Sequence, residues 1–117
     1  MTAYYQRHLC RLDPWPDCLQ RTFDGFGMQA YLTMWGPSEF TCTGCLQKAD
    51  LTPRLPELRV PTLFTCGRYD EATPGTVERF CRLIPNGRME IIEDASHEHH
   101  LERPEEYLST VRKFLAP

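Results

Sequence analysis

Two short apolar runs in the second half of the chain constrain its fold more than any other feature. Val60–Cys66 and Met89–Glu93 are rich in residues that favour strands, and a segment with helical spacing separates them. That segment opens with Thr73 and Pro74, which suit the N-cap and the first position of a helix. Its apolar stripe runs from Val77 to Ile84, and Pro85-Asn86-Gly87 is predicted to end it. Strand, helix and strand in this order predict a βαβ unit with a parallel pair of strands.

A second helix is predicted after these strands. It begins at Pro104, and its apolar residues recur at helical spacing: Tyr107, Leu108, Val111, Phe114 and Leu115. Two parallel strands are too few for a complete sheet, because a parallel sheet is normally buried on both faces and continues on at least one side. We therefore expect an α/β chain that represents the C-terminal part of a larger sheet and has an open strand edge.

Residues 1–50 have a different character. They are rich in aromatic and turn residues, with short helices predicted at Pro16–Phe23 and Met28–Trp35 and no clear strand alternation. Short helices with large apolar side chains need another surface to pack on. We expect residues 1–50 to form part of a helical cap, and residues 51–117 to form a βαβα core that starts with a short helix or turn at Leu51–Leu58.

Composition argues against several kinds of partner. The chain has 117 residues, a net charge of −3 and no basic block, so nucleic acid is not an expected partner. No apolar run approaches the roughly 18–20 residues of a membrane helix, and the first residues do not resemble a secretory signal. We expect one cytoplasmic domain with reduced cysteines. Cys42 and Cys45 form a C-x-x-C without a second pair for zinc, so incidental thiols on a turn are favoured over a redox or metal site.

Polar residues follow both predicted strands. Asp70 and His97 each lie about four residues beyond a strand, at the edge of an open α/β sheet where ligands bind. There they would suit the orienting acid and the general base of a nucleophilic triad, in the order Asp then His that α/β hydrolases use. Taken singly, Asp70 is also an ordinary turn residue, and His97 an ordinary loop histidine.

The nucleophile of such a triad is not evident. The G-x-S-x-G elbow is absent, and Gly36–Phe40 is only a near match, because Phe40 replaces the second glycine and no strand precedes it. Ser38 is therefore a poor candidate, and Ser96 and Ser109 also lack the context of an elbow.

Two further groups of residues allow more than one interpretation. A dense cluster of histidines and acids misses the H-E-x-x-H pattern, so a charged loop is favoured over a metal site; it comprises Asp94, His97, His99, His100 and Glu102. Glu39 and Glu71 lie beside the predicted site, where two carboxylates would suit a substrate ammonium group. Solvated turn carboxylates are the alternative.

Motifs along nearly the whole chain resemble one family. They are Leu12–Pro16, Met34–Phe40, Thr43–Gly44, Val60–Leu63, Gly67–Pro74, Ser96–His97 and Leu101–Glu105. Together they resemble the C-terminal part of proline iminopeptidases, α/β hydrolases that release N-terminal proline from peptides. The G-P-S-E-F and G-R-x-D-E-A-T-P motifs are the most specific of the set.

The resemblance implies a role for each candidate residue. Asp70 would be the acid and His97 the base of a serine triad, while Glu39 and Glu71 would hold the free α-amino group of the substrate. It also implies a cap whose aromatic residues line a proline-sized pocket, and no metal or organic cofactor. The family's early strands, glycine-rich oxyanion loop and elbow serine have no counterpart here, so we expect the chain alone to be nearly inactive.

Two alternatives to a hydrolase remain open. The chain would also suit a non-catalytic module that binds amino groups through Glu39 and Glu71, or that binds through its open strand edge a missing N-terminal half or a second copy of itself. A small metalloprotein built on the histidine cluster is the other alternative.

Overall fold

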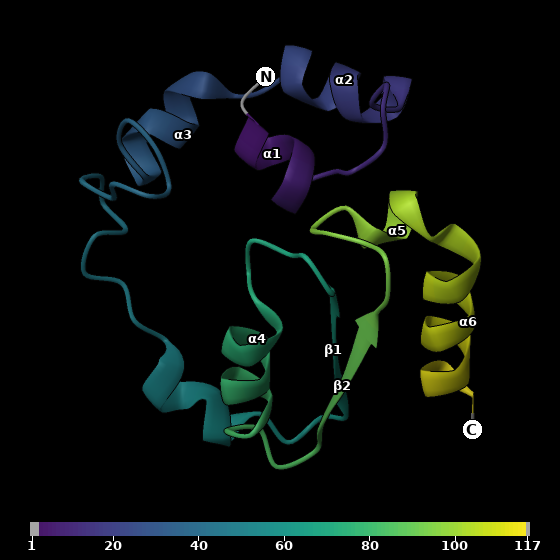
Figure 1. Cartoon of the computed structure of the whole chain (residues 1–117). Helices are drawn as coiled ribbons and strands as arrows, with labels where there is room; N and C mark the ends of the chain where they lie inside the picture. The colour runs from purple at the N-terminus through teal and green to yellow at the C-terminus, as the bar shows by residue number, and fades with distance from the viewer. Residues whose placement is uncertain (1–2, 117) are drawn as a thin grey trace. The chain divides into compact units, whose positions relative to one another are not determined.

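The computed structural model describes residues 3–116, and the chain divides into two compact units. One unit contains the described residues up to Pro16 together with those from Arg54 onward, and the other is Asp17–Pro53. Figure 1 labels the α-helices and the strands along the chain. In order they are α1 (Ala3–His8), α2 (Asp17–Asp24), α3 (Met28–Met34), the 3-10 helix η1 (Thr52–Glu57), β1 (Thr62–Gly67), α4 (Pro74–Cys81), β2 (Gly87–Ile92), α5 (His99–Glu102) and α6 (Pro104–Leu115).

The two strands form the predicted parallel pair. Their register runs from Thr62 opposite Gly87 to Gly67 opposite Ile92, so both strands end at the same edge of the sheet. Helices α4 and α6 flank this pair (Figure 1). They lie on opposite faces, because Met89 lines a hollow with residues of α4, whereas its neighbour Arg88 lines one with residues of α6. The fold is thus α/β, as predicted.

Burial is concentrated at the carboxyl ends of the strands. Cys66 at the end of β1 and Ile92 at the end of β2 are both 1% exposed, and Ala95 just beyond is fully buried. The start of the first apolar run differs from the prediction of a strand that is covered on both faces. Val60 lies outside β1 and is 63% exposed, and Thr62 to Thr65 are only half-buried. Within the described residues the sheet has two strands, so β1 has a hydrogen-bonded neighbour on one side only.

Helix α4 begins where its capping residues predict. The Thr73 side chain accepts a hydrogen bond from the Thr76 N–H, and Pro74 occupies the first turn. The helix ends at Cys81, before the last residue of its predicted apolar stripe, Ile84. Gly87 permits the tight return into β2, because a Cβ at this position would lie 2.6 Å from the Cys81 carbonyl oxygen.

Residues 3–16 depart from the expected boundary near residue 50. They contain α1, which the sequence analysis did not predict, and they belong with the sheet in the first unit. Leu9 is 8% exposed and Cys10 is fully buried. Trp15 donates its indole N–H to the Cys10 carbonyl at 3.0 Å. This unit therefore takes part of its core from a segment far from the strands in sequence.

The second unit contains α2 and α3 close to their predicted bounds. The segment after α3 folds back on it, since the Cys45 N–H donates to the Thr33 carbonyl at 3.0 Å. Gly44 permits this approach, because a Cβ there would lie 2.3 Å from the Met34 carbonyl oxygen. Cys42 and Cys45 thus lie on a packed turn, with free thiols. Among residues 3–116, no helix has the length and apolarity needed to cross a membrane.

Candidate active site

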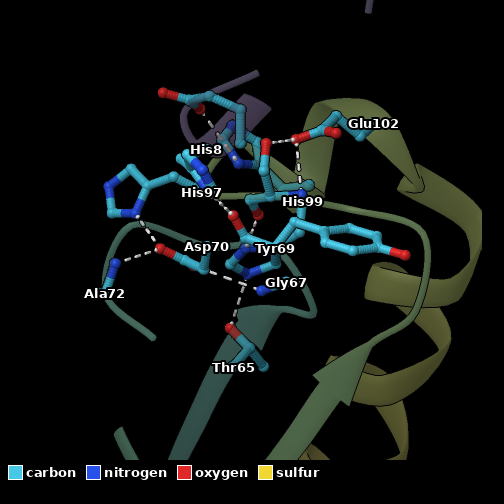
Figure 2. A network of polar contacts seen from close by, with 12 residues as sticks. His8, Thr65, Gly67, Tyr69, Asp70, Ala72, His97, His99 and Glu102 are labelled. Atoms are coloured by element: carbon cyan, nitrogen blue, oxygen red, sulfur yellow. Dashed lines mark hydrogen bonds and ion pairs between the residues drawn. The ribbon is translucent and has the colours of Figure 1, made fainter. Parts of the chain in front are cut away.

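The Asp70 carboxylate is held by the turn that follows β1. Its Oδ2 accepts the Gly67 N–H at 3.3 Å, and its Oδ1 accepts the Ala72 N–H at 2.8 Å (Figure 2). The residue is 4% exposed. The side chain therefore satisfies its own turn, as the simpler interpretation of Asp70 required. That same bonding fixes the direction in which its free lone pairs point.

His97, in the turn after β2, meets this carboxylate. Its Nδ1 lies 2.9 Å from Asp70 Oδ1, so sequence positions 27 residues apart come together at the end of the sheet. A dashed line marks this contact in Figure 2. The ring is half-exposed, with 45% of its side chain accessible. An imidazole that donates from Nδ1 to a carboxylate presents the lone pair of Nε2 as a base, which is the orientation required of a histidine that accepts a proton from a nucleophile.

Electrostatics favour the charged form of this imidazole. The hydrogen bond to Asp70 raises the pKa of His97, and partial burial opposes the rise. The negative charges of Asp70, Glu71 and Glu98 raise it further. The pair is thus arranged to stabilise an imidazolium, the state that a general base reaches after it takes a proton.

The close approach of the two turns depends on Gly67. A Cβ there would lie 2.3 Å from the Ser96 carbonyl oxygen and 2.4 Å from that of Ala95. Beyond it, the Tyr69 N–H donates to the Ala95 carbonyl at 2.9 Å. The Arg68 guanidinium also pairs with the Glu93 carboxylate across the two turns. Absence of a side chain at Gly67 therefore lets the Asp70 turn and the His97 turn pack directly together.

The segment after α1 joins both turns. The His8 carbonyl accepts the Glu71 N–H at 3.2 Å and the His97 N–H at 3.1 Å. The His8 ring nitrogen Nδ1 lies 2.8 Å from the Tyr69 carbonyl oxygen. The Leu9 carbonyl accepts the Glu98 N–H at 2.8 Å. Sequence reasoning missed this role, because hydrogen bonds to backbone carbonyls leave no pattern in the sequence. The apolar side chain of Leu9 is the one sign that the segment packs against something.

The histidine cluster separates into residues with different surroundings. His99 is buried, with Nε2 3.0 Å from the Thr65 hydroxyl and its ring edge-on to Tyr107. His100 lies 3.6 Å from the Glu98 carboxylate. Within residues 3–116, no three His, Cys, Asp or Glu side chains are grouped so that they could hold a metal ion. The cluster therefore supports the turn and the core in addition to supplying His97.

The two predicted amine-binding glutamates lie in different units. Glu71 follows Asp70 in the first unit, where its charge acts on His97. Glu39 belongs to the second unit, where its carboxylate accepts a hydrogen bond from the Tyr31 hydroxyl and its N–H donates to that same oxygen at 2.9 Å. Within the first unit the structure thus brings together Asp70, His97 and Glu71.

Residues with nucleophilic side chains are placed away from the geometry of a nucleophile elbow. Ser38 lies in an isolated bridge with Thr41, and Ser109 lies within α6. Ser96 is fully buried and donates its hydroxyl to Glu102 at 2.6 Å. Burial raises the pKa of the Cys66 thiol to about 11, and the Asp70 charge adds to the rise, so this thiol is protonated at neutral pH.

Fold and site together define the class of protein. The model of the α/β hydrolase family matches residues 3–110, and this chain belongs to that family. Within this family, the chain is similar to proline iminopeptidases, as the sequence motifs predicted. The proline iminopeptidase of Heyndrickxia coagulans is 42% identical over 106 residues, which cover 90% of this chain and 37% of the relative.

Solved structures agree with this assignment. The crystal structure of proline iminopeptidase from Mycobacterium smegmatis matches with a TM-score of 0.85 and 39% identity, over 96% of this chain and 38% of the other. The crystal structure of VinJ matches with a TM-score of 0.87 and 42% identity, over 97% of this chain and 39% of the other. The chain therefore spans less than two fifths of the length of these proteins.

Proposed function

We propose that this chain carries the acid and the base of a serine-type proline iminopeptidase, with Asp70 as the acid and His97 as the base. The observation that carries the proposal is the 2.9 Å contact between Asp70 Oδ1 and His97 Nδ1 at the carboxyl ends of two parallel strands. The similarity to proline iminopeptidases supports the choice of substrate, a peptide with a free N-terminal proline. No cofactor takes part in this chemistry.

The proposed reaction assigns one step to each side chain. Asp70 holds the imidazole with its proton on Nδ1, and His97 Nε2 takes the proton of a serine hydroxyl as that oxygen attacks the prolyl carbonyl. The imidazolium then gives this proton to the departing amine of the next residue. In the second half of the reaction, Nε2 activates water against the prolyl ester in the same way. The nucleophilic serine and the oxyanion donors come from a polypeptide segment outside these 117 residues, whose sequence has no G-x-S-x-G.

The resemblance to proline iminopeptidases extends the proposal to two carboxylates for the substrate's amino group, Glu71 and Glu39. An N-terminal proline carries a secondary ammonium group, which a carboxylate recognises by charge and hydrogen bonding. The position of Glu71 directly after the proposed acid places a negative charge beside the reacting base. In this proposal Glu39 of the second unit supplies the second carboxylate, and that unit, Asp17–Pro53, supplies part of an aromatic cap.

Reconstitution of activity tests this function. We expect the purified chain alone to hydrolyse a prolyl arylamide no faster than buffer. Mixing it with the part of the H. coagulans relative that it does not match should restore turnover, and His97→Ala should then lower kcat by roughly 10⁴-fold or more. His97-dependent turnover by the chain alone would refute the expected inactivity. Restored turnover that His97→Ala leaves unchanged would refute the role of the base.

A second candidate function is a binding module without catalysis. It is favoured by the pairing of β1 on one side only within the described residues, since an unpaired strand edge can pair with another chain. The partner would be a complementary hydrolase segment or a second copy of this chain. Sedimentation of the purified chain, alone and with the complementary segment, tests this function. A chain that stays monomeric in both samples would exclude edge pairing.

A further inference from the structure

Glu102, at the end of α5, joins its own helix to two other segments, one of which is distant in sequence. Its Oε1 accepts both the backbone N–H of Ser96 at 3.0 Å and the Ser96 hydroxyl at 2.6 Å. Its Oε2 accepts the backbone N–H of Arg11 at 3.2 Å. Figure 2 shows this carboxylate above the turn that carries His97. One side chain thus bonds to the segment after β2 and to the segment after α1.

Ser96 transmits this constraint to His97, because the two residues are adjacent in sequence. Ser96 is fully buried, and its carbonyl oxygen lies 3.3 Å from His99 Nδ1. The same carbonyl is the atom that a Cβ at Gly67 would meet at 2.3 Å. The Ser96 N–H and hydroxyl donate hydrogen bonds, and the Ser96 carbonyl packs on Gly67. Together these contacts fix the backbone of Ser96, the residue directly before His97.

The contact of Glu102 with Arg11 supports His97 from the other side. The segment from His8 to Arg11 gives its His8 carbonyl to the His97 N–H at 3.1 Å. The Arg11 guanidinium lies over the Tyr69 ring, 4.1 Å from its centroid, which secures the segment against the Asp70 turn. Because Glu102 anchors both Ser96 and Arg11, loss of its carboxylate would loosen two of the supports on either side of His97 at once.

We propose that Glu102 is a positioning residue that holds the His97 imidazole on Asp70 by fixing Ser96 and Arg11. The catalytic consequence rests on the proposed function, but the placement of the imidazole does not, so it is measured directly. The charges that act on His97 are those of Asp70, Glu71 and Glu98. A change at Glu102 therefore reaches the imidazole through geometry.

The test is an NMR titration of His97 in the full chain and its Glu102 variants. Glu102→Ala should lower the pKa of His97 towards its ordinary value, because the imidazole no longer stays on Asp70. Glu102→Gln should keep most of the raised pKa, because the amide oxygen still accepts both hydrogen bonds of Ser96. Glu106→Ala is the matched control, because Glu106 forms an ion pair with the exposed Arg103. This variant should leave the pKa of His97 unchanged.

Each outcome decides the proposal. An unchanged His97 pKa in a folded Glu102→Ala variant would overturn it. An equal fall in Glu102→Gln would overturn the role given to Ser96, because that variant keeps both Ser96 bonds and loses only the charge and the acceptor of the Arg11 N–H. If Glu102→Ala fails to fold, Ser96→Ala decides, because it removes only the 2.6 Å hydroxyl bond. A smaller fall of the His97 pKa in Ser96→Ala supports the proposal, and no change overturns it. Failure of the reconstitution assay would affect the proposed function and leave this result standing.

Discussion

At the scale of single residues, the Asp70 carboxylate has two roles, one in its own turn and one towards His97. Its carboxylate completes a turn by accepting the N–H groups of Gly67 and Ala72, and it also accepts from the His97 ring. The turn bonds hold the carboxylate in place without any help from His97. The acid is therefore preorganised, and the backbone N–H groups of its turn are satisfied as well. The simple structural interpretation and the functional one therefore describe the same geometry.

The Asp70–His97 pair predicts a pH dependence of stability. Asp70 raises the pKa of His97 in the folded state above its ordinary value of 6.5, so the folded state binds this proton more tightly than the unfolded chain does. The resulting stabilisation is complete below pH 6.5 and is lost as the pH rises through the raised pKa. Urea unfolding of the wild type should show this decline, and Asp70→Asn should reduce it. Equal pH profiles for the two proteins would contradict the prediction.

Gly67 is the residue at which added bulk should be least tolerated. Gly67→Ala places a Cβ 2.3 Å from the Ser96 carbonyl oxygen, so the two turns must separate. We expect a loss of about 1–3 kcal/mol in the free energy of unfolding. Gly75→Ala in α4 is the matched control, because a Cβ there meets nothing within 4 Å. It should stabilise by about 0.5–1 kcal/mol through helix propensity. Similar effects of both changes in urea unfolding would refute the steric argument.

At the scale of elements, the parts that sequence predicts well are those with local signals. Thr73 and Pro74 start α4 because capping and a fixed φ need no distant partner. The end of α4 was predicted too late, because the return to β2 depends on packing of Gly87 against Cys81. α1 and α5 were missed because they are short, at 6 and 4 residues, and their stability comes from tertiary contacts.

The N-cap of α4 gives a prediction at this scale. Thr73→Ala removes the side-chain acceptor of the Thr76 N–H and should lower the free energy of unfolding by about 0.5–2 kcal/mol. Thr73→Asp keeps an acceptor and adds a charge that suits the positive end of the helix, so it should preserve stability. Thermal or urea unfolding of the three proteins measures this. A loss as large in Thr73→Asp as in Thr73→Ala would show that the cap is not the cause.

At the scale of the whole molecule, the sequence predicts some contacts between distant segments and misses others. The βαβ order was sufficient for the parallel pair, and the spacing of Asp70 and His97 was sufficient to predict one shared sheet edge. The grouping of residues 3–16 with the sheet was not predictable, because it relies on carbonyls of His8 and Leu9 that any residue could supply. The anchoring role of Glu102 was hidden for the same reason, since its partners include two backbone N–H groups.

The first segment should therefore contribute to the stability of the sheet. Leu9 is 8% exposed, and Leu9→Ala should lower the free energy of unfolding by about 2–4 kcal/mol. Hydrogen exchange at the His97 and Glu98 amides should also accelerate, because these N–H groups donate to His8 and Leu9. Leu12→Ala is the control, since Leu12 is 36% exposed and should cost about 1 kcal/mol or less. Equal responses to both changes would place Leu9 outside the core.

The most direct test of the account is an NMR titration of the His97 ring in the wild type and in Asp70→Asn. If the carboxylate and the imidazole meet as described, the pKa of His97 lies above 6.5 in the wild type and falls clearly when Asp70 loses its charge and its acceptor. A His97 pKa that is ordinary in the wild type, or identical in the two proteins, would contradict the pairing on which the proposed acid and base depend.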